Sequence, residues 1–249
     1  MYLTTTGLVL RVTNYNDTDA LLTVLTHNHG KLTLKARGLR RKNSRLIGAC
    51  QLLAYAEFTL FEYRDMYTIN EARTIEMFHG LRKDIQRLSL GTYFAQVAEV
   101  LCQEDLPNPD LLSLALNSLY VLSQPHADER QVRATFELRC ACLAGYTPDL
   151  TGCAKCGTTD RVRFDLRAGQ LECGNCRNSE SDGIRIPVDP GALDAMRYIC
   201  TCSAKQIFSY KLGVVSMENL SQISELYLLT QLEHGFSTLD FYKSLLLMP

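Results

Sequence analysis

The first eighty residues alternate apolar and polar side chains with a period of two, which is typical of strands that bury one face. The alternation is clearest at residues 31–37, where Leu32, Leu34 and Ala36 are expected to point into a core. Similar runs between turn-forming segments predict five strands, at residues 8–13, 20–26, 31–37, 52–63 and 66–77. Five short antiparallel strands in about eighty residues suit a small barrel such as an OB-fold.

After residue 80 the apolar positions recur every three or four residues, as in a helix that contains Leu90, Phe94 and Val97. Start and stop signals predict five more helices: after Pro109, from Asp128 to Gly145, after Asp189-Pro190, from Ser216 to about Gly235, and from a capping box of Ser237 with Asp240. The expected fold class is therefore α+β. An N-terminal five-stranded OB-fold barrel at residues 1–80 would precede an α-helical domain at residues 81–249.

The composition is that of a globular protein, with 46% hydrophobic and 21% charged residues. The longest uncharged stretch, residues 111–127, is short for a bilayer span and is interrupted by serine and asparagine. No basic segment followed by an apolar block begins the sequence. We therefore expect a cytoplasmic protein with reduced cysteines and no membrane contact.

Four of the ten cysteines form two Cys-x2-Cys pairs that are sixteen residues apart: Cys153, Cys156, Cys173 and Cys176. A hairpin between the pairs can place four thiolates around a tetrahedral ion, and Gly157 and Gly174 are expected to permit the tight turns. Because all four ligands are sulfur, no position is left open for water. The spacing therefore predicts one structural Zn²⁺ ion, in a zinc-finger module at about residues 150–186 inserted in the helical domain.

Two other interpretations of these cysteines are a redox-active pair and a pair of disulfides. Two pairs at zinc-ribbon spacing disfavour the first, and a reducing compartment disfavours the second. The remaining six cysteines are expected to be buried free thiols. Neighbours two residues apart on a helix, such as Cys140 and Cys142 or Cys200 and Cys202, lie on different faces and chelate poorly.

The net charge of −1 hides a positive cluster near the N-terminus. Residues 1–80 carry ten basic and seven acidic side chains, whereas residues 81–249 carry sixteen and twenty. Seven of the basic residues occur without any acid between positions 31 and 45: Lys31, Lys35, Arg37, Arg40, Arg41, Lys42 and Arg45. An ordinary solvated face seldom has one sign of charge alone, so the cluster indicates a nucleic-acid backbone as partner.

Three aromatic residues, Tyr55, Phe61 and Tyr63, share one face of the predicted fourth strand. On an OB-fold such side chains can stack on the bases of a single strand. The more economical interpretation, which we take as the expectation, places them in the barrel core or in an interdomain contact.

Two blocks of sequence resemble the RecO family of recombinational-repair proteins. The first comprises Gly7-Leu8-Val9-Leu10-Arg11, Leu25-Thr26, His29-Gly30-Lys31, Ala36-Arg37-Gly38, Arg41 and Ser44-Arg45. The second comprises Phe136-Glu137-Leu138-Arg139, Gly145-Tyr146, Pro148-Asp149-Leu150 and Cys153-x2-Cys156-Gly157. In one departure, Asp19 is followed by Ala20 where the family often has a basic residue.

The resemblance implies an OB-fold, a helical domain and a zinc-finger insertion. It further implies that the protein binds single- and double-stranded DNA, anneals complementary strands and associates with the nucleoid. RecR would be the main partner in loading the RecA recombinase onto DNA coated by the single-stranded-DNA-binding protein. The acidic, apolar C-terminal tail of that protein would also bind, and Arg130, Arg133 and Arg139 are the candidate cations unless they form an ordinary charged helix face.

No enzyme is expected, because the histidines form no His-Glu-x-x-His and no Gly-x4-Gly-Lys-Ser/Thr loop occurs. Two alternatives stay open: a zinc-ribbon RNA-binding or transcription-associated factor, and a scaffold without nucleic-acid contact. The sequence also leaves open whether the zinc module contacts DNA through Arg161, Arg163 or Arg167.

Overall fold

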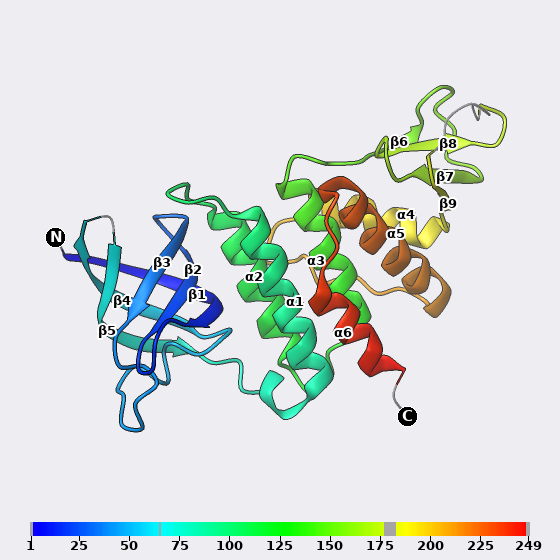
Figure 1. Cartoon of the computed structure of the whole chain (residues 1–249). Helices are drawn as coiled ribbons and strands as arrows, with labels where there is room; N and C mark the ends of the chain where they lie inside the picture. The colour runs from blue at the N-terminus through cyan, green and yellow to red at the C-terminus, as the bar shows by residue number, and fades with distance from the viewer. Residues whose placement is uncertain (1, 65, 177–182, 248–249) are drawn as a thin grey trace. The chain divides into compact units, whose positions relative to one another are not determined.

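The computed structural model describes residues 2–64, 66–176 and 183–247, which form two compact units (Figure 1). Unit 1 combines Met1–Ala127 with Phe236–Pro249, and unit 2 is Asp128–Gly235. The boundary predicted at residues 80 and 81 follows the change from strands to helices, whereas these units follow the packing. Within the predicted zinc module, residues 177–182 lie outside the described residues.

Five strands close into the predicted OB-like barrel: β1 (Tyr2–Asn14), β2 (Ala20–Thr26), β3 (Lys31–Ala36), β4 (Tyr55–Tyr63) and β5 (Met66–Glu76). Around the barrel the order is β1-β2-β3-β5-β4. The expectation of antiparallel pairing throughout is wrong for β3 and β5, which are parallel, with Leu34 opposite Tyr67. An odd number of strands cannot close with antiparallel neighbours alone, so one pair must run in parallel.

Alternate residues of the strands fill the barrel, including Leu32, Leu34 and Ala36 as predicted. β1 departs from simple alternation, because Leu8, Val9 and Leu10 are all buried. Val9 belongs to the barrel core, while β1 also packs against the first long helix and so has a second covered face.

Unit 1 also contains a short 3-10 helix (Leu81–Lys83) and the helices α1 (Ile85–Leu101), α2 (Pro109–Leu122) and α6 (Ser237–Leu246). Asp84 and Asn108 cap α1 and α2 by accepting hydrogen bonds from backbone amides of the first turn. The capping box predicted at Ser237 does not form, because α6 begins after Phe236 and has no side-chain cap. Packing against α1 positions α6 instead, with the Phe236 ring 5.5 Å from the Tyr93 ring.

Unit 2 contains α3 (Glu129–Leu143), α4 (Pro190–Thr201) and α5 (Val214–Leu232). Asp128 and Asp189 cap α3 and α4 as predicted. The expected start of α5 at Ser216 is two residues late, because the Ser216 hydroxyl donates to the Asp189 carboxylate rather than capping its own helix. None of the helices in the described ranges has both the length and the apolar character that crossing a bilayer requires.

Unit 2 also contains a four-stranded sheet, in which β6 and β8 end at Cys153 and Cys173: β6 (Asp149–Cys153), β7 (Val162–Asp165), β8 (Gln170–Cys173) and β9 (Arg185–Pro187), in the order β6-β8-β7-β9. The buried Arg185 pairs with Glu172 at 2.7 Å and with Asp165 at 3.3 Å. It thereby ties the last strand to the two strands before it, a role that sequence spacing did not reveal.

Candidate metal centre and nucleic-acid surface

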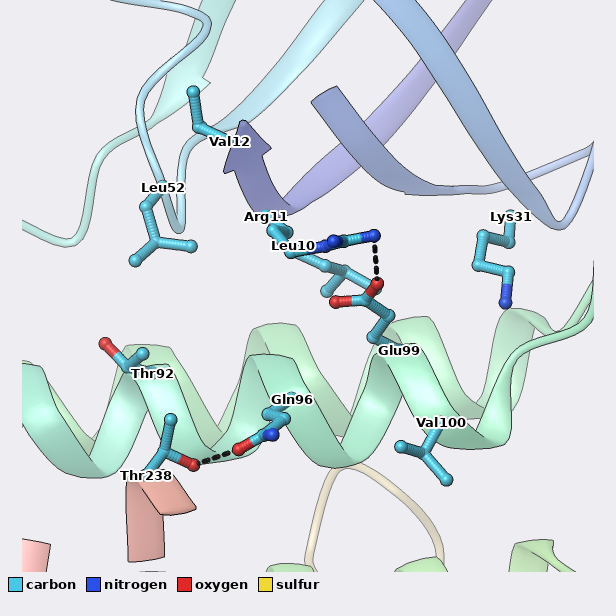
Figure 2. A pocket seen from close by; sticks show the side chains of 10 residues that line it. All are labelled: Leu10, Arg11, Val12, Lys31, Leu52, Thr92, Gln96, Glu99, Val100 and Thr238. Carbon is cyan, nitrogen blue, oxygen red and sulfur yellow. Dashed lines mark hydrogen bonds and ion pairs between the residues drawn. The ribbon is translucent and has the colours of Figure 1, made fainter. Parts of the chain in front are cut away.

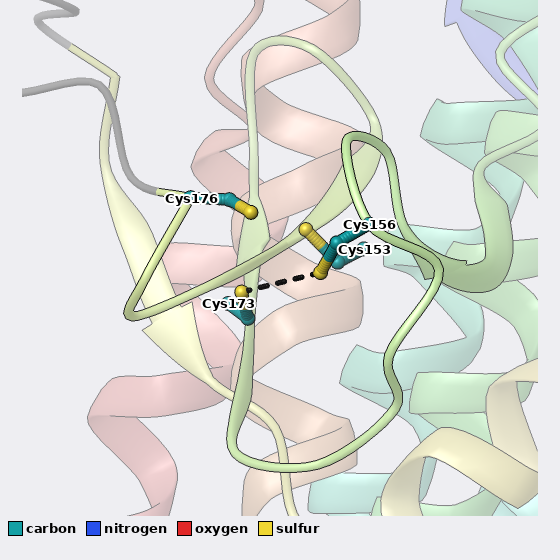
Figure 3. A group of neighbouring side chains, drawn as sticks. All are labelled: Cys153, Cys156, Cys173 and Cys176. Carbon is teal, nitrogen blue, oxygen red and sulfur yellow. Dashed lines mark hydrogen bonds between the residues drawn. The ribbon is translucent and has the colours of Figure 1, made fainter.

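The four predicted ligands come together in unit 2 (Figure 3). Cys153 ends β6 and Cys173 ends β8, and these strands are parallel neighbours, so both knuckles begin at one edge of the sheet. All four Sγ atoms lie within 4.8 Å of one another, and those of Cys156 and Cys173 are 3.6 Å apart. A tetrahedral ion with metal–sulfur bonds of about 2.3 Å separates its ligands by roughly 3.8 Å. The cysteines can therefore hold one metal ion.

The pKa values of two of the four thiols are shifted in opposite directions. Backbone N–H groups of Lys155, Cys156 and Cys173 lower the pKa of Cys153 to about 6. Hydrogen bonding with the thiols of Cys156 and Cys173 instead raises the pKa of Cys176 to about 12. The Cys153 thiolate therefore forms readily, while Cys176 resists losing its proton. A divalent cation removes this conflict, because it binds thiolates and displaces their protons.

Glycines shape the first knuckle, although only in part as predicted. Gly157 has a φ of +75°, which explains glycine there. The expectation for Gly174 is wrong, because its φ is not positive and an added Cβ would meet no heavy atom within 4 Å. Gly152 is the residue that spacing missed: a Cβ there would lie 2.3 Å from the carbonyl oxygen of Gly157.

Lys155 joins the two knuckles, because its Nζ donates to the Cys176 carbonyl at 2.8 Å. Its charge partly offsets the excess negative charge of four thiolates around a divalent ion. Arg161 and Arg167 are exposed in the turns on either side of β7, and Arg163 is half-buried on that strand.

The basic residues of the N-terminal cluster follow β3 and the loop after it. Residues 37–54 form successive turns rather than a detached loop, because Leu39 and Leu46 pack on the barrel core and Ala49 and Cys50 belong to it. Four cations are exposed and make no ion pair within residues 2–64, 66–176 and 183–247: Arg37, Arg41, Lys42 and Arg45. The barrel thus holds these four side chains in solvent.

Two other members of the cluster position the loop. Asp19 pairs with Lys35 at 3.7 Å and accepts a hydrogen bond from the Gly38 amide at 2.9 Å. The Gly38 hydrogen bond is the main reason that the pKa of Asp19 is lowered. Arg40 donates to the Asn16 carbonyl at 2.7 Å. Lys35 and Arg40 therefore hold the start of the loop in place and are less available to a phosphate.

The expectation that Tyr55, Phe61 and Tyr63 lie in the barrel core or an interdomain contact is wrong for Phe61 and Tyr63, which are 41% and 60% exposed. The strand turns Ala56, Phe58 and Leu60 inward, and alternation therefore turns the odd-numbered residues outward. Tyr55 is half-buried, and its hydroxyl bonds to Thr6.

Phe61 connects the aromatic face with the basic cluster. Its ring lies 5.4 Å from the ring of Tyr2, and both line a shallow cavity of about 280 Å³ together with Arg37. The connection follows from the strand order, because β5 lies between β4 and β3 and Arg37 directly follows β3. An exposed cation and two exposed rings therefore share one surface, which we call the Arg37–Phe61 face.

Lys31 lies apart from this face, at the other end of β3. It lines a second cavity of unit 1, of about 660 Å³, between β1 and α1 (Figure 2). In that cavity Arg11 pairs with Glu99 at 2.9 Å, and Thr238 bonds to Gln96. Strand rise separates Lys31 from Arg37 by roughly 20 Å, so the seven cations do not form one compact patch.

The three arginines predicted for an acidic tail have different surroundings in unit 2. Arg133 pairs with Glu225 and Glu137, and its side chain is only 11% exposed. Arg139 donates to the carbonyls of Ile199 and Cys200 and so terminates α4. Arg130 has an exposed guanidinium, 3.8 Å from Glu218. Tail binding stays a prediction, and Arg130 is the residue among the three whose charge is most accessible.

Comparison with known proteins gives matches over nearly the whole chain. Residues 1–78 match the family model described as Recombination protein O N terminal, and residues 82–240 match Recombination protein O C terminal. A protein named DNA repair protein RecO from Acetivibrio thermocellus is 35% identical over 98% of this chain and 97% of its own length. Proteins with the same name from Alkaliphilus metalliredigens and Symbiobacterium thermophilum are 30% and 27% identical over 98% and 96% of this chain, and over 100% and 96% of their own lengths.

Proposed function

Because the chain belongs to the RecO family of DNA repair proteins, we propose that it binds single- and double-stranded DNA and anneals complementary strands. We extend the proposal to its place in recombination. With RecR as partner, it helps to load the RecA recombinase onto DNA coated by the single-stranded-DNA-binding protein. Its proposed place of action is the nucleoid, in the cytoplasm.

The observation that carries the proposal is the Arg37–Phe61 face together with the exposed cations of the loop after β3. Exposed cations replace the counterions of a phosphate backbone, which favours binding to any DNA strand. Exposed aromatic rings add contacts to unpaired bases, which are accessible only in a single strand. A surface with both features can hold a single strand, and its cations alone can hold a duplex.

Annealing on such a surface breaks no covalent bond, so we propose that the protein is not an enzyme. Its cations reduce the repulsion between two phosphate backbones until complementary bases meet. Once the bases pair they stack within the duplex and leave the aromatic rings. The duplex is then held by phosphate contacts alone and can be released.

We propose that the metal of the four-cysteine centre is Zn²⁺ and that it is structural. An all-thiolate tetrahedral set is typical of zinc and leaves no coordination position for substrate. The residues that would hold it are Cys153, Cys156, Cys173 and Cys176, and the bound ion would supply a crosslink between β6 and β8. Its role in DNA repair is then to keep the module folded.

The test of the DNA-binding surface is annealing of complementary single strands coated with their binding protein. We expect the variant Arg37→Glu/Arg41→Glu/Lys42→Glu to anneal more slowly and to bind both single strands and duplex more weakly. The slope of affinity against salt should fall by about 2 to 3 in magnitude, because up to three phosphate contacts are lost. Arg40 is left unchanged because it holds the loop in place.

A matched control carries the same change of charge elsewhere. Lys83, Lys205 and Lys211 are exposed and lie outside the N-terminal cluster, and their triple substitution by glutamate should retain annealing and the salt slope. Equal effects of the two triple variants would show that net charge, and not this surface, governs DNA binding. Undiminished DNA affinity in the first variant would overturn the proposal.

A further inference from the structure

A second pair of cysteines meets outside the metal centre. Cys142 lies in the last turn of α3 and Cys200 in the last turn of α4, and their Sγ atoms are 3.6 Å apart. Both side chains are half-buried. The spacing of the cysteines along each helix gave no hint of this contact, because it joins residues of two different helices.

The two thiols have opposite acidities. The pKa of Cys142 is lowered, first by its hydrogen bond with the Cys200 thiol and then, against the effect of burial, by the Thr147 hydroxyl and the Arg139 guanidinium. The pKa of Cys200 is raised, mainly by that same hydrogen bond and then by burial. Arg139 is fixed beside the pair by its hydrogen bonds to the carbonyls of Ile199 and Cys200. The pair thus places a thiol that ionises more readily than an ordinary cysteine against a second thiol that retains its proton.

We propose that Cys142 and Cys200 are a site of reversible oxidation, at which a hydroperoxide converts the two thiols into a disulfide. The Cys142 thiolate attacks the terminal oxygen of the hydroperoxide and breaks the O–O bond. The remaining oxygen takes up a proton and leaves as an alcohol, or as water from hydrogen peroxide, and Cys142 becomes a sulfenic acid. The Cys200 sulfur then attacks the Cys142 sulfur, and hydroxide leaves with the Cys200 proton as water. Two thiols lose two electrons and two protons, and a dithiol restores them.

The other cysteines outside the metal centre are poorly suited to this chemistry. Burial raises the pKa of Cys50 to about 12 and that of Cys102 to about 11. The pKa of Cys140, which is fully enclosed, and that of Cys202 are also raised by burial. Since the thiolate is the reactive form, Cys142 should react first among these six.

A disulfide at this place would act on the metal module. The chain from Cys142 to Cys200 contains β6, β7, β8 and β9 and all four metal ligands. The two sulfurs must approach by roughly 1.5 Å to reach a bonded distance of about 2.05 Å. The bond would join the ends of α3 and α4 and so hold the two ends of the module together. This inference is independent of the proposed DNA binding.

The experiment uses the full-length, zinc-loaded protein, treated with hydrogen peroxide and then with an alkylating reagent. Peptide mapping by mass spectrometry should find the Cys142 and Cys200 peptides crosslinked and two hydrogen masses lighter than the free peptides together. A dithiol should reverse the crosslink. Cys202→Ser, the matched control, should form it as the wild type does. In Cys200→Ser a sulfenic acid should accumulate on Cys142, where dimedone can trap it.

Zinc release is followed in the same samples, since the metal ligands also contain sulfur. If Cys142 and Cys200 remain free thiols at a peroxide dose that already oxidises Cys156 and releases zinc, the proposal is wrong. Sulfinic acid on Cys142 of the wild type without the crosslink would also overturn it. Both measurements use the wild type, so neither depends on whether the variants fold.

Discussion

Single residues of the same charge have different roles here, depending on whether a carboxylate lies beside them. Lys35, Arg133 and Arg185 each lie within 4 Å of an acidic side chain and are largely buried, so they stabilise the fold. Arg37 and Arg41 are exposed and remain available to an external anion. The proposed phosphate contacts therefore depend on the surroundings of each basic residue and not on the number of basic residues.

The aromatic part of the Arg37–Phe61 face can be tested separately from its charge. Phe61→Ala should weaken binding of single-stranded DNA by about 1–3 kcal/mol, because one base loses its stacking surface. Duplex affinity should be unchanged, since paired bases are not accessible to the ring. Fluorescence anisotropy with both DNA forms measures the difference. Tyr120→Ala, at an exposed position of α2, should change neither affinity, and an equal loss on both DNA forms in Phe61→Ala would contradict base stacking.

Sequence patterns predicted single residues well where the information was local. The inward positions of β3 and the clustering of the four cysteines followed from spacing alone. The pairing of Lys35 with Asp19 and of Arg133 with Glu225 did not, because each joins residues from different elements. The prediction for Phe61 and Tyr63 failed for a related reason. Their hydrophobic character suggested a core position, whereas the alternation of β4, with Ala56, Phe58 and Leu60 inward, turns them outward.

Among the elements, the small sheet of unit 2 depends most on crosslinks. Its strands have only three to five residues each, and isolated sheets with such short strands have little independent stability. The Arg185 ion pairs join β9 to β7 and β8, and a metal ion held by the four cysteines would join β6 to β8. Loss of the ion should therefore unfold this module before the helices.

A single ligand substitution tests that dependence. Cys173→Ser should bind less zinc and become sensitive to protease near residue 165, because a structural zinc site can contribute on the order of 10 kcal/mol to folding. Zinc content by a chromophoric chelator and limited proteolysis measure the two effects. Cys202→Ser removes a thiol outside the metal centre and should change neither. Full zinc occupancy in Cys173→Ser would contradict the assignment of ligands.

The whole molecule is organised by packing that the order of elements along the chain does not reveal. Caps and breakers predicted both ends of α3 and the starts of α2 and α4, because these signals act within a few residues. The return of the C-terminal helix α6 to unit 1 had no such signal, since it depends on contacts between Phe236 and Tyr93 and between Thr238 and Gln96. The chain therefore passes from α2 into unit 2 and returns to unit 1 only with its last helix, α6.

Phe236 directly precedes α6, and its buried ring is expected to contribute to the stability of unit 1. Phe236→Ala should destabilise that unit by about 3–5 kcal/mol, because it removes a buried ring packed against Tyr93. Phe241→Ala, the matched control on α6, changes a ring that is 52% exposed and should have little effect. Hydrogen exchange localises the result: amides of the barrel and α1 should lose protection in Phe236→Ala, while those of α3 and α5 keep theirs. Equal loss of protection in both units would mean that they unfold as one, and that the C-terminal helix supports the whole chain rather than the unit it completes.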